Sequence, residues 1–302
     1  MSLSFPSPPI VLFWMMVFAT CFIFFVALSY FLLQVLTALD SEPFLQNIKF
    51  PSSPSELATQ SDLFSRGGRN LLRGCVSAID GIALRICRPQ VCEVPNPSSY
   101  WTRKSFFAVN VQAAVGADYK VQFLSTVTAG SCHDSTAFMS SGLAALLAAA
   151  DGLPRGYWAA GDDAYIAGLR VLTPWRGHNL PWEKDSFNYY HSSSRTFVEQ
   201  VFGKIVGRWD VLWRPIRFSV SCAALIVRVC ARLHKFLVER SSPRVDESLW
   251  VDCVGGGSSA LIMLDQCDLD DRLRQRRRDR EPCPLRVALT RRLKQLQCRC
   301  PA

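Results

Sequence analysis

Cysteine pairs with the spacing of common zinc sites are missing from this chain, although it contains twelve cysteines. No CxxC pair and no Cys/His zinc spacing occurs, and Cys298 and Cys300 are too close together for a typical structural zinc pair. This pattern excludes the common small zinc modules. We interpret the cysteines mostly as buried thiols of a reducing compartment.

Basic residues are also missing from the start of the chain, where no Lys or Arg precedes Lys49. From Ile10 to Leu36 there is no charged residue of either sign, and a bilayer span needs only about 20 apolar residues. A cleaved signal peptide fits less well, because no basic residue precedes the run. We therefore assign 1–39 to an apolar transmembrane helix and expect membrane contact through residues 10–36.

Two further stretches read as connections or tails. Residues 40–73 are rich in Ser and Pro and are expected to form a linker. Residues 240–302 are interpreted as a linker, which includes VGGGSSA, followed by a basic tail. From Arg272 onward the tail holds eleven Lys and Arg against two acids, which equals the net charge of +9 of the whole chain. Its LRQRRRDR run is either a nuclear-localisation or non-specific nucleic-acid patch, or a basic tail without a specific use.

Three acids, Asp80, Asp162 and Glu199, carry the chemical hypothesis. They are too far apart in sequence for local pairing and can meet only through a folded sheet and helix. Each has an ordinary alternative: Asp80 opens a turn, Asp162 and Asp163 form a loop pair or helix cap, and Glu199 lies on a solvated helix face. Together they predict a metal site, because clustered carboxylates need a cation and Mg2+ prefers oxygen ligands.

The surrounding pattern predicts an α/β fold with a mixed sheet flanked by helices. The segments VSAIDGIALRICR, SFFAVNVQAAV and KVQFLSTVTA read as strands, which places Asp80 on a central strand. GYWAAGDDAY reads as a fourth strand that delivers Asp162 at its carboxyl end. The sequence His133-Asp134-Ser135 precedes a helix, so Asp134 or Ser135 either caps it or supports the metal ligands.

Collinear motifs from about Gly74 to Glu239 support this interpretation. AIDGIALRICRP, AGSCHDSTAF, GYWAAGDDAY, LTPWRG and SSSRTFVEQVFGKIVGRW appear in the order found in Harbinger-type (PIF/Harbinger) transposases and their DDE-superfamily endonuclease relatives, which this chain resembles. The resemblance implies that 74–239 is an RNase H-like nuclease domain acting on DNA in the nucleus. It also implies that Asp80, Asp162 and Glu199 bind Mg2+ or Mn2+ and are catalytic.

The same resemblance ranks Asp163 behind Asp162 as second ligand, because the aspartate of the family stands three residues before a tyrosine, here Tyr165. His133, Asp134 and Asp163 are expected to support the metal ligands. Aromatic residues near the acids either stack on unpaired bases or pack in the core. Basic residues in the matching segment either contact phosphates or form a solvated face, and the candidates are Arg103, Lys104, Arg195, Lys204 and Arg208.

Transposases of this type usually carry a helix-turn-helix-like region before the nuclease, and nothing between Met1 and Arg73 reads as one. Sequence-specific targeting is therefore unsupported by the sequence, which leaves three alternatives: a truncated or degenerate copy, a relic reading frame with a new apolar start, or a nuclease that relies on a separate DNA-binding partner protein. Two functions follow from the sequence. The first is a metal-dependent endonuclease or transposase that cuts or transfers DNA phosphodiesters. The alternative is a non-catalytic, membrane-anchored or DNA-binding derivative that keeps the fold.

Overall fold

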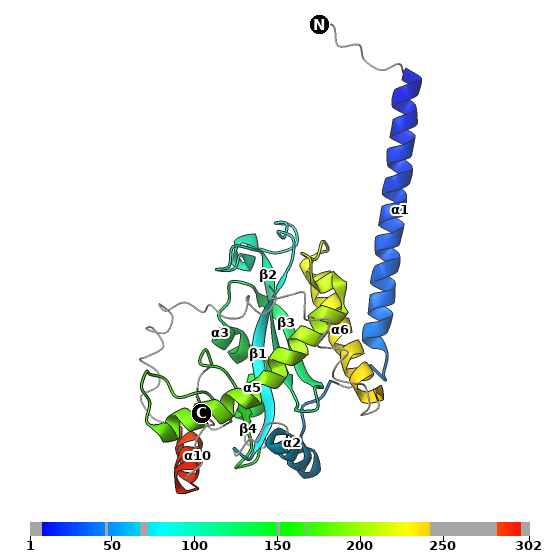
Figure 1. The fold of residues 1–302 in the computed structure, drawn as a ribbon. Coiled ribbons are helices and arrows are strands. Elements are labelled where there is room, and N and C mark those ends of the chain that lie inside the picture. The colour runs from blue at the N-terminus through cyan, green and yellow to red at the C-terminus, as the bar shows by residue number, and fades with distance from the viewer. Residues whose placement is uncertain are drawn as a thin grey trace. The chain divides into compact units, whose positions relative to one another are not determined.

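The computed structural model describes residues 8–45, 48–66, 72–149, 152–165, 167–168, 170–241 and 283–296, which fall into two units, Met1–Gln46 and Asn47–Ala302. The first unit contains one helix, α1 (Pro8–Ser41). The second contains a sheet, several helices and two short 3-10 turns (Figure 1). Its elements are α2 (Pro54–Arg66), β1 (Cys75–Arg85), η1 (Pro97–Tyr100), β2 (Ala108–Val115), β3 (Val121–Ala129), α3 (Asp134–Met139), α4 (Gly142–Ala148), β4 (Trp158–Ala160), β5 (Val171–Leu172), α5 (Trp182–Arg208), η2 (Asp210–Leu212), α6 (Val220–Arg240) and α10 (Pro284–Gln295).

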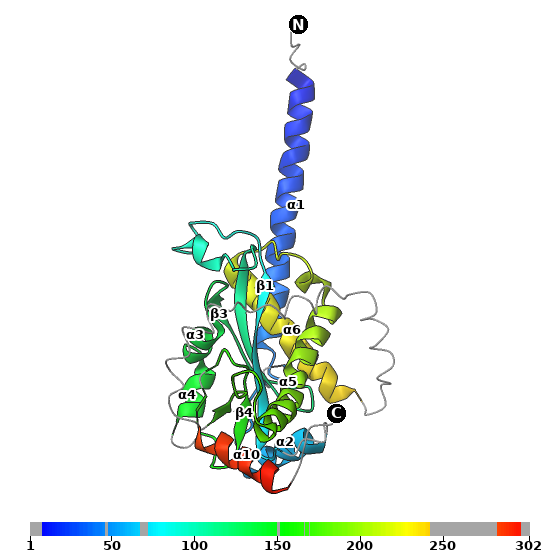
Figure 2. The ribbon, with the colours of Figure 1, turned by 60° about the vertical axis from the view of Figure 1, so that its left-hand side comes forward.

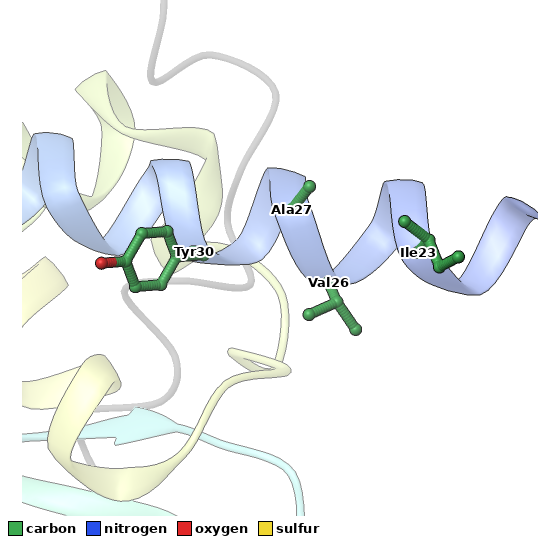
Figure 3. A pocket seen from close by; sticks show the side chains of 4 residues that line it. All are labelled: Ile23, Val26, Ala27 and Tyr30. Atoms are coloured by element: carbon green, nitrogen blue, oxygen red, sulfur yellow. The ribbon is translucent and has the colours of Figure 1, made fainter.

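The helix α1 exposes apolar side chains and carries a shallow apolar hollow lined by Ile23, Val26, Ala27 and Tyr30 (Figure 3). These four side chains offer no ionisable group apart from the Tyr30 hydroxyl, so the hollow is no candidate for chemistry. The transmembrane expectation for 1–39 is not supported: none of the helices in the described residues combines the length and apolar character that crossing a membrane requires.

The second unit is built on a five-stranded mixed sheet in the order β3-β2-β1-β4-β5. The strand β1 pairs antiparallel with β2 and parallel with β4, and Asp80 faces Ala113 across the first of these pairs. The predicted mixed sheet and the central position of Asp80 are therefore confirmed. The dense apolar runs of β1 and β2 suit strands that are covered on both faces.

Helices cover both faces of the sheet, and the alternation of side chains along β1 assigns each residue to one of them. Ile79 packs with Phe138 and Leu143 of the α3–α4 side, whereas Ile82 and Leu84 lie against α5 and α6. Figure 1 shows α5 crossing β1, and Figure 2 shows α3 and α4 on the opposite side of the sheet. Asp80, in phase with Ile82, therefore points toward the α5 face.

The segment 40–73, expected to be a linker, contains the helix α2, which packs against β1. A capping box starts this helix: Glu56 accepts hydrogen bonds from the Ser52 and Ser53 amides at 3.0 Å, and the Ser53 hydroxyl accepts one from the Glu56 amide at 3.2 Å. These bonds lower the pKa of Glu56 to about 2. Buried Phe64 then packs edge-on against Phe197 of α5, with ring centroids 5.1 Å apart.

The segment 240–302, expected to be a linker and tail, also contributes a helix to the folded unit. Here α10 packs against α5, with Arg286, Leu289 and Leu293 buried. The helix is visible at the base of the domain in Figure 2. The LRQRRRDR run lies outside the described residues, so the expectation of a nucleic-acid patch there stays a prediction.

Candidate active site

Asp80 lies in the middle of β1 and is 8% exposed. Its Oδ1 accepts a hydrogen bond of 2.8 Å from the next amide, Gly81 N. Burial, followed by the negative charge of Asp162, raises the pKa of Asp80 to about 7, although nearby Arg195 opposes the rise. A carboxyl group held in this state at neutral pH takes up a cation readily, because the cation removes the cost of the buried charge.

Asp162 follows the end of β4, and the parallel pairing of Ala78 with Ala160 brings it beside Asp80. Its Oδ1 accepts a hydrogen bond of 2.9 Å from the Ala164 amide, which fixes the turn after the strand. Burial raises the pKa of Asp162, and Arg195 lowers it. The expected delivery of this acid at the carboxyl end of a strand is what the fold shows.

Glu199 lies on α5, and Arg195, one helical turn earlier, links it to Asp80. The Arg195 Nη2 is 3.3 Å from Glu199 Oε1 and 3.7 Å from Asp80 Oδ2. The phase of this helix follows its apolar pattern, since Phe197, Val201 and Ile205 are buried while Arg195 and Glu199 share another face. One guanidinium thus holds the first and third acids of the predicted triad.

On the other face of β1, a hydrogen-bond network surrounds Asp134. Its Oδ1 accepts hydrogen bonds of 2.9 Å from both Asn110 and Gln112, two alternate residues of β2. Gln112 in turn accepts a bond of 2.7 Å from the Tyr165 hydroxyl. A Cβ at Gly81 would overlap Asp134 Oδ1 and Gln112 Nε2, so only glycine leaves room for this network beside Asp80.

The structure separates the roles expected for the supporting residues. His133, rather than Asp134 or Ser135, caps α3, because its Nδ1 accepts from the Ser135 amide at 3.3 Å. The expected cap was wrong because the Asp134 side chain is taken by the β2 amides. Asp163 contributes its backbone oxygen, which accepts a hydrogen bond from Arg176 Nη2.

The five basic candidates occupy different surroundings. Arg103 and Lys104 are exposed between η1 and β2. Arg195 pairs with the acids as described, and the Lys204 ammonium lies 3.5 Å from the centroid of the Tyr119 ring. Partial burial lowers the pKa of Arg208. Only the first two therefore lie on an open surface of the described part of the domain.

Metal binding can be tested against the donor chemistry of this site. Within the residues that the structure describes, no three His, Cys, Asp or Glu side chains converge closely enough to hold an ion, because Arg195 stands between Asp80 and Glu199. The oxygen donors and the mutual repulsion of Asp80 and Asp162 nevertheless fit a hard divalent cation. The expected convergence of Asp80, Asp162 and Glu199 around an ion is therefore not shown in the described residues, although Asp80 and Asp162 offer the oxygen donors that such a cation prefers.

The sequence analysis missed three polar side chains that organise this site: Asn110, Gln112 and Tyr165. The signal was present, since Asn110 and Gln112 are the only polar residues of AVNVQAAV and their spacing of two places them on one face of the strand. Tyr165 stands three residues after Asp162. The Tyr165 hydroxyl donates to Gln112 of β2, and this bond anchors the turn that carries Asp162 to the sheet. The spacing of three residues between Asp162 and Tyr165 therefore has a structural reason.

The geometry agrees with the comparison of this chain with known families. The sequence model described as DDE superfamily endonuclease matches residues 79–235, which include all three acids and the strands and helices that carry them. No curated protein and no solved structure gives a significant match. With more than half of its residues covered by this match, the chain belongs to the DDE superfamily endonuclease family.

Proposed function

We propose that this chain is a metal-dependent, transposase-like nuclease of the Harbinger type, with an RNase H-like fold, that cuts or transfers DNA phosphodiesters. The observation that carries the proposal is the buried carboxyl group of Asp80 on β1 beside the half-buried carboxyl group of Asp162, which follows the neighbouring parallel strand β4 and whose negative charge raises the pKa of Asp80. Buried carboxylates at this proximity are unfavourable without a compensating cation. In a nuclease of this family, the binding of Mg2+ or Mn2+ relieves this unfavourable electrostatic energy.

In this proposal Asp80, Asp162 and Glu199 hold the metal. Bound Mg2+ or Mn2+ supplies charge stabilisation for an in-line displacement at phosphorus and activates the attacking oxygen. The protein side chains contribute position: the Gly81 amide orients Asp80, the Ala164 amide orients Asp162, and α5 supplies Glu199. In this proposal DNA is the partner, and the protein binds it in the nucleus.

Arg195 has a further part in the proposal. Its Nε is buried and has no hydrogen-bond partner among the described residues, although its Nη2 contacts two acids. A buried donor without a partner is costly, and a non-bridging phosphate oxygen would satisfy it. We assign Arg195 to the bound phosphate: with a cation held by the carboxylates, the guanidinium would be available to contact the DNA backbone.

Arg103 and Lys104 extend this contact along the DNA as phosphate-binding residues outside the acid site. Sequence-specific targeting is assigned to a separate DNA-binding partner protein. The support for this division is that the matched residues 79–235 correspond to an endonuclease domain.

The test is DNA nicking by the full chain with Mg2+ or Mn2+. Asp162→Asn removes one ligand charge without opening a cavity, so activity should disappear while circular dichroism and the melting temperature show a folded protein. Asp210→Asn, which changes an exposed acid at the start of η2, is the matched control and should keep wild-type activity. Nicking that survives Asp162→Asn, or that needs no divalent ion, would contradict the proposal.

A second candidate is a non-catalytic, DNA-binding derivative, and one observation favours it: Arg195 already neutralises the acids from within the chain. In a derivative of this kind the guanidinium takes the place of the cation permanently. The two functions differ in one outcome. Folded wild-type protein that binds DNA but never nicks it, across metals and substrates, selects the derivative.

A further inference from the structure

The helix α10 lies beyond the residues that match the endonuclease family, yet it is bonded to the segment that carries Asp162. Arg286 is 6% exposed, and its Nη1 lies 3.3 Å from the Thr173 carbonyl oxygen and 3.2 Å from that of Pro174. Its guanidinium also stacks over the Trp175 ring, 4.1 Å from the centroid. A solvated basic tail would leave its arginines in water, whereas Arg286 is buried, hydrogen-bonded and stacked on an aromatic ring.

Further bonds of α10 fall on either side of β5, which follows the Asp162 turn. Before the helix, the Cys283 thiol donates to the Gly168 carbonyl oxygen at 2.9 Å. Along the helix, the Thr290 hydroxyl accepts from Trp175 Nε1 at 3.0 Å, and Lys294 pairs with Glu183 of α5 at 3.1 Å. The helix therefore contacts both the loop that leads into β5 and the loop that leaves it.

A short chain of bonds joins these contacts to the acid site. Trp175 is held by Asn188 of α5, which accepts from its amide at 2.7 Å and donates to its carbonyl at 2.9 Å. The next residue, Arg176, donates to the backbone oxygen of Asp163, directly beside Asp162. On the opposite side the same turn is tied to β2 through Tyr165. The Asp162 turn is thus fixed from the sheet and from the α10 side.

We infer that α10 is a positioning element of the acid site: by holding Gly168 and Thr173–Trp175 it fixes the loop through which Arg176 orients the Asp162 turn. The inference rests on the proposed function only where metal binding is concerned. Residues that orient metal ligands from behind affect the site without touching the ion. Asp162 itself remains in place only while its turn keeps one conformation.

The experiment uses the full chain with Arg286→Met, which removes the guanidinium but keeps an apolar stem, and Leu293→Asp, which places a charge on the buried face of α10. Hydrogen exchange measured by mass spectrometry should become faster in 284–295 and in 161–176 but stay unchanged in β1 and β2. Affinity for Mn2+ should weaken by about tenfold, the loss typical of residues that support metal ligands. Arg292→Met, on the exposed face of the same helix, is the matched control and should change neither quantity.

Undocking of α10 with unchanged exchange in 161–176 overturns the inference, whatever the metal result. If the wild-type chain binds no Mn2+, the proposed function fails, while the exchange data still decide the role of α10. If both variants unfold the whole domain, Thr290→Val replaces them, because it removes only the bond from Trp175 and the local bond of the Thr290 hydroxyl to the Arg286 carbonyl oxygen. Exchange in 161–176 that is no faster in this variant than in wild type counts against the inference as well.

Discussion

The guanidinium of Arg195 lies between Asp80 and Glu199, 3.7 Å from the first carboxylate and 3.3 Å from the second. A side chain of the protein thus occupies the position between two acids that the proposed metal needs. Because Arg195 and the metal carry the same sign of charge, they compete for the same carboxylates.

This competition gives the first prediction. Arg195→Gln should raise the affinity of the acid site for Mn2+ several-fold, because the competing cation is removed, while DNA cleavage falls because no guanidinium remains to bind the phosphate. Isothermal titration with Mn2+ measures the first effect and nicking assays the second. Arg217→Gln, an exposed arginine elsewhere on the chain, should leave both unchanged. Weaker Mn2+ binding in Arg195→Gln would show that the guanidinium organises the acids instead of competing for them.

The second prediction concerns pH. Asp80 has its pKa raised from 3.8 to about 7, mainly by burial. Between these values the folded chain keeps a proton on Asp80 that the unfolded chain has released, so the stability that this group contributes is highest at the acidic end and declines as the pH rises. In the absence of metal, the contribution of Asp80 to the free energy of unfolding should fall by about 1 kcal/mol per pH unit across this window.

The variant Asp80→Asn tests the assignment of this slope, because a neutral amide resembles the protonated acid. Urea unfolding in the presence of a chelator, repeated from pH 4 to pH 8, should show that the variant gains stability relative to wild type as the pH rises and is the more stable of the two at pH 8. Equal slopes would assign the effect to another group.

The third prediction concerns Gly81. Replacement by alanine should cost about 1–3 kcal/mol, because the added methyl group overlaps Asp134 and Gln112. Loss of the Asp134 network should also reduce nicking. Gly203→Ala in α5 is the control: a Cβ there meets nothing within 4 Å, and the helix should gain about 0.5–1 kcal/mol. Thermal unfolding of both variants gives the comparison, and a neutral Gly81→Ala would mean that the network can shift.

The fourth prediction tests whether α2 belongs to the folded domain. Phe64 is 1% exposed and packs against Phe197 on the helix that carries Glu199. Phe64→Ala should therefore lower the free energy of unfolding by about 3–5 kcal/mol, the range for removing a buried aromatic ring. Asp62→Ala, on the exposed side of α2, should change it little. If urea denaturation shows only a small change in the free energy of unfolding for Phe64→Ala, residues 40–73 are a linker as first expected.

The fifth prediction separates the basic run from α10. Replacing Arg272, Arg274, Arg276, Arg277 and Arg278 with Gln should weaken DNA binding and flatten its dependence on salt, by about 0.9 in the logarithmic slope for each phosphate that is no longer neutralised. Substitution is preferable to deletion, because deletion would also remove α10. Binding curves at several salt concentrations provide the slope, and an unchanged slope would assign these residues no role in DNA binding.

Sequence patterns predicted the sheet well, because the strands β1, β2 and β3 are short segments rich in apolar and β-branched residues. The helix α2 was overlooked although Ser53 and Glu56 form a capping box, since the Ser and Pro content of the segment suggested a linker. The pairing of Arg286 with Trp175 joins residues far apart in sequence. No local pattern could have revealed it, and for that reason α10 was assigned to the tail.

In the acid site, the three acids and the helix phase were predictable, but the place of Arg195 was not. The spacing of four residues between Arg195 and Glu199 places the two side chains beside each other on a helix, and the sequence suggested phosphate contact as the role of Arg195. Its second contact, with Asp80, depends on how α5 crosses the sheet, which is fixed by side-chain packing between the two layers. The separation of the acids by a guanidinium is therefore a property of the folded chain alone.

The crowding at Gly81 has a consequence for recognising related chains. An Asp-Gly pair in a strand usually suggests a turn, but here the glycine is required because the Asp134 carboxylate and the Gln112 amide fill the space that a side chain would take. A strand with Asp-Gly inside an apolar run, followed by a strand with two polar residues in alternate positions, is therefore a composite signature. Reading both strands together distinguishes an acid-bearing strand of this architecture from an ordinary hairpin.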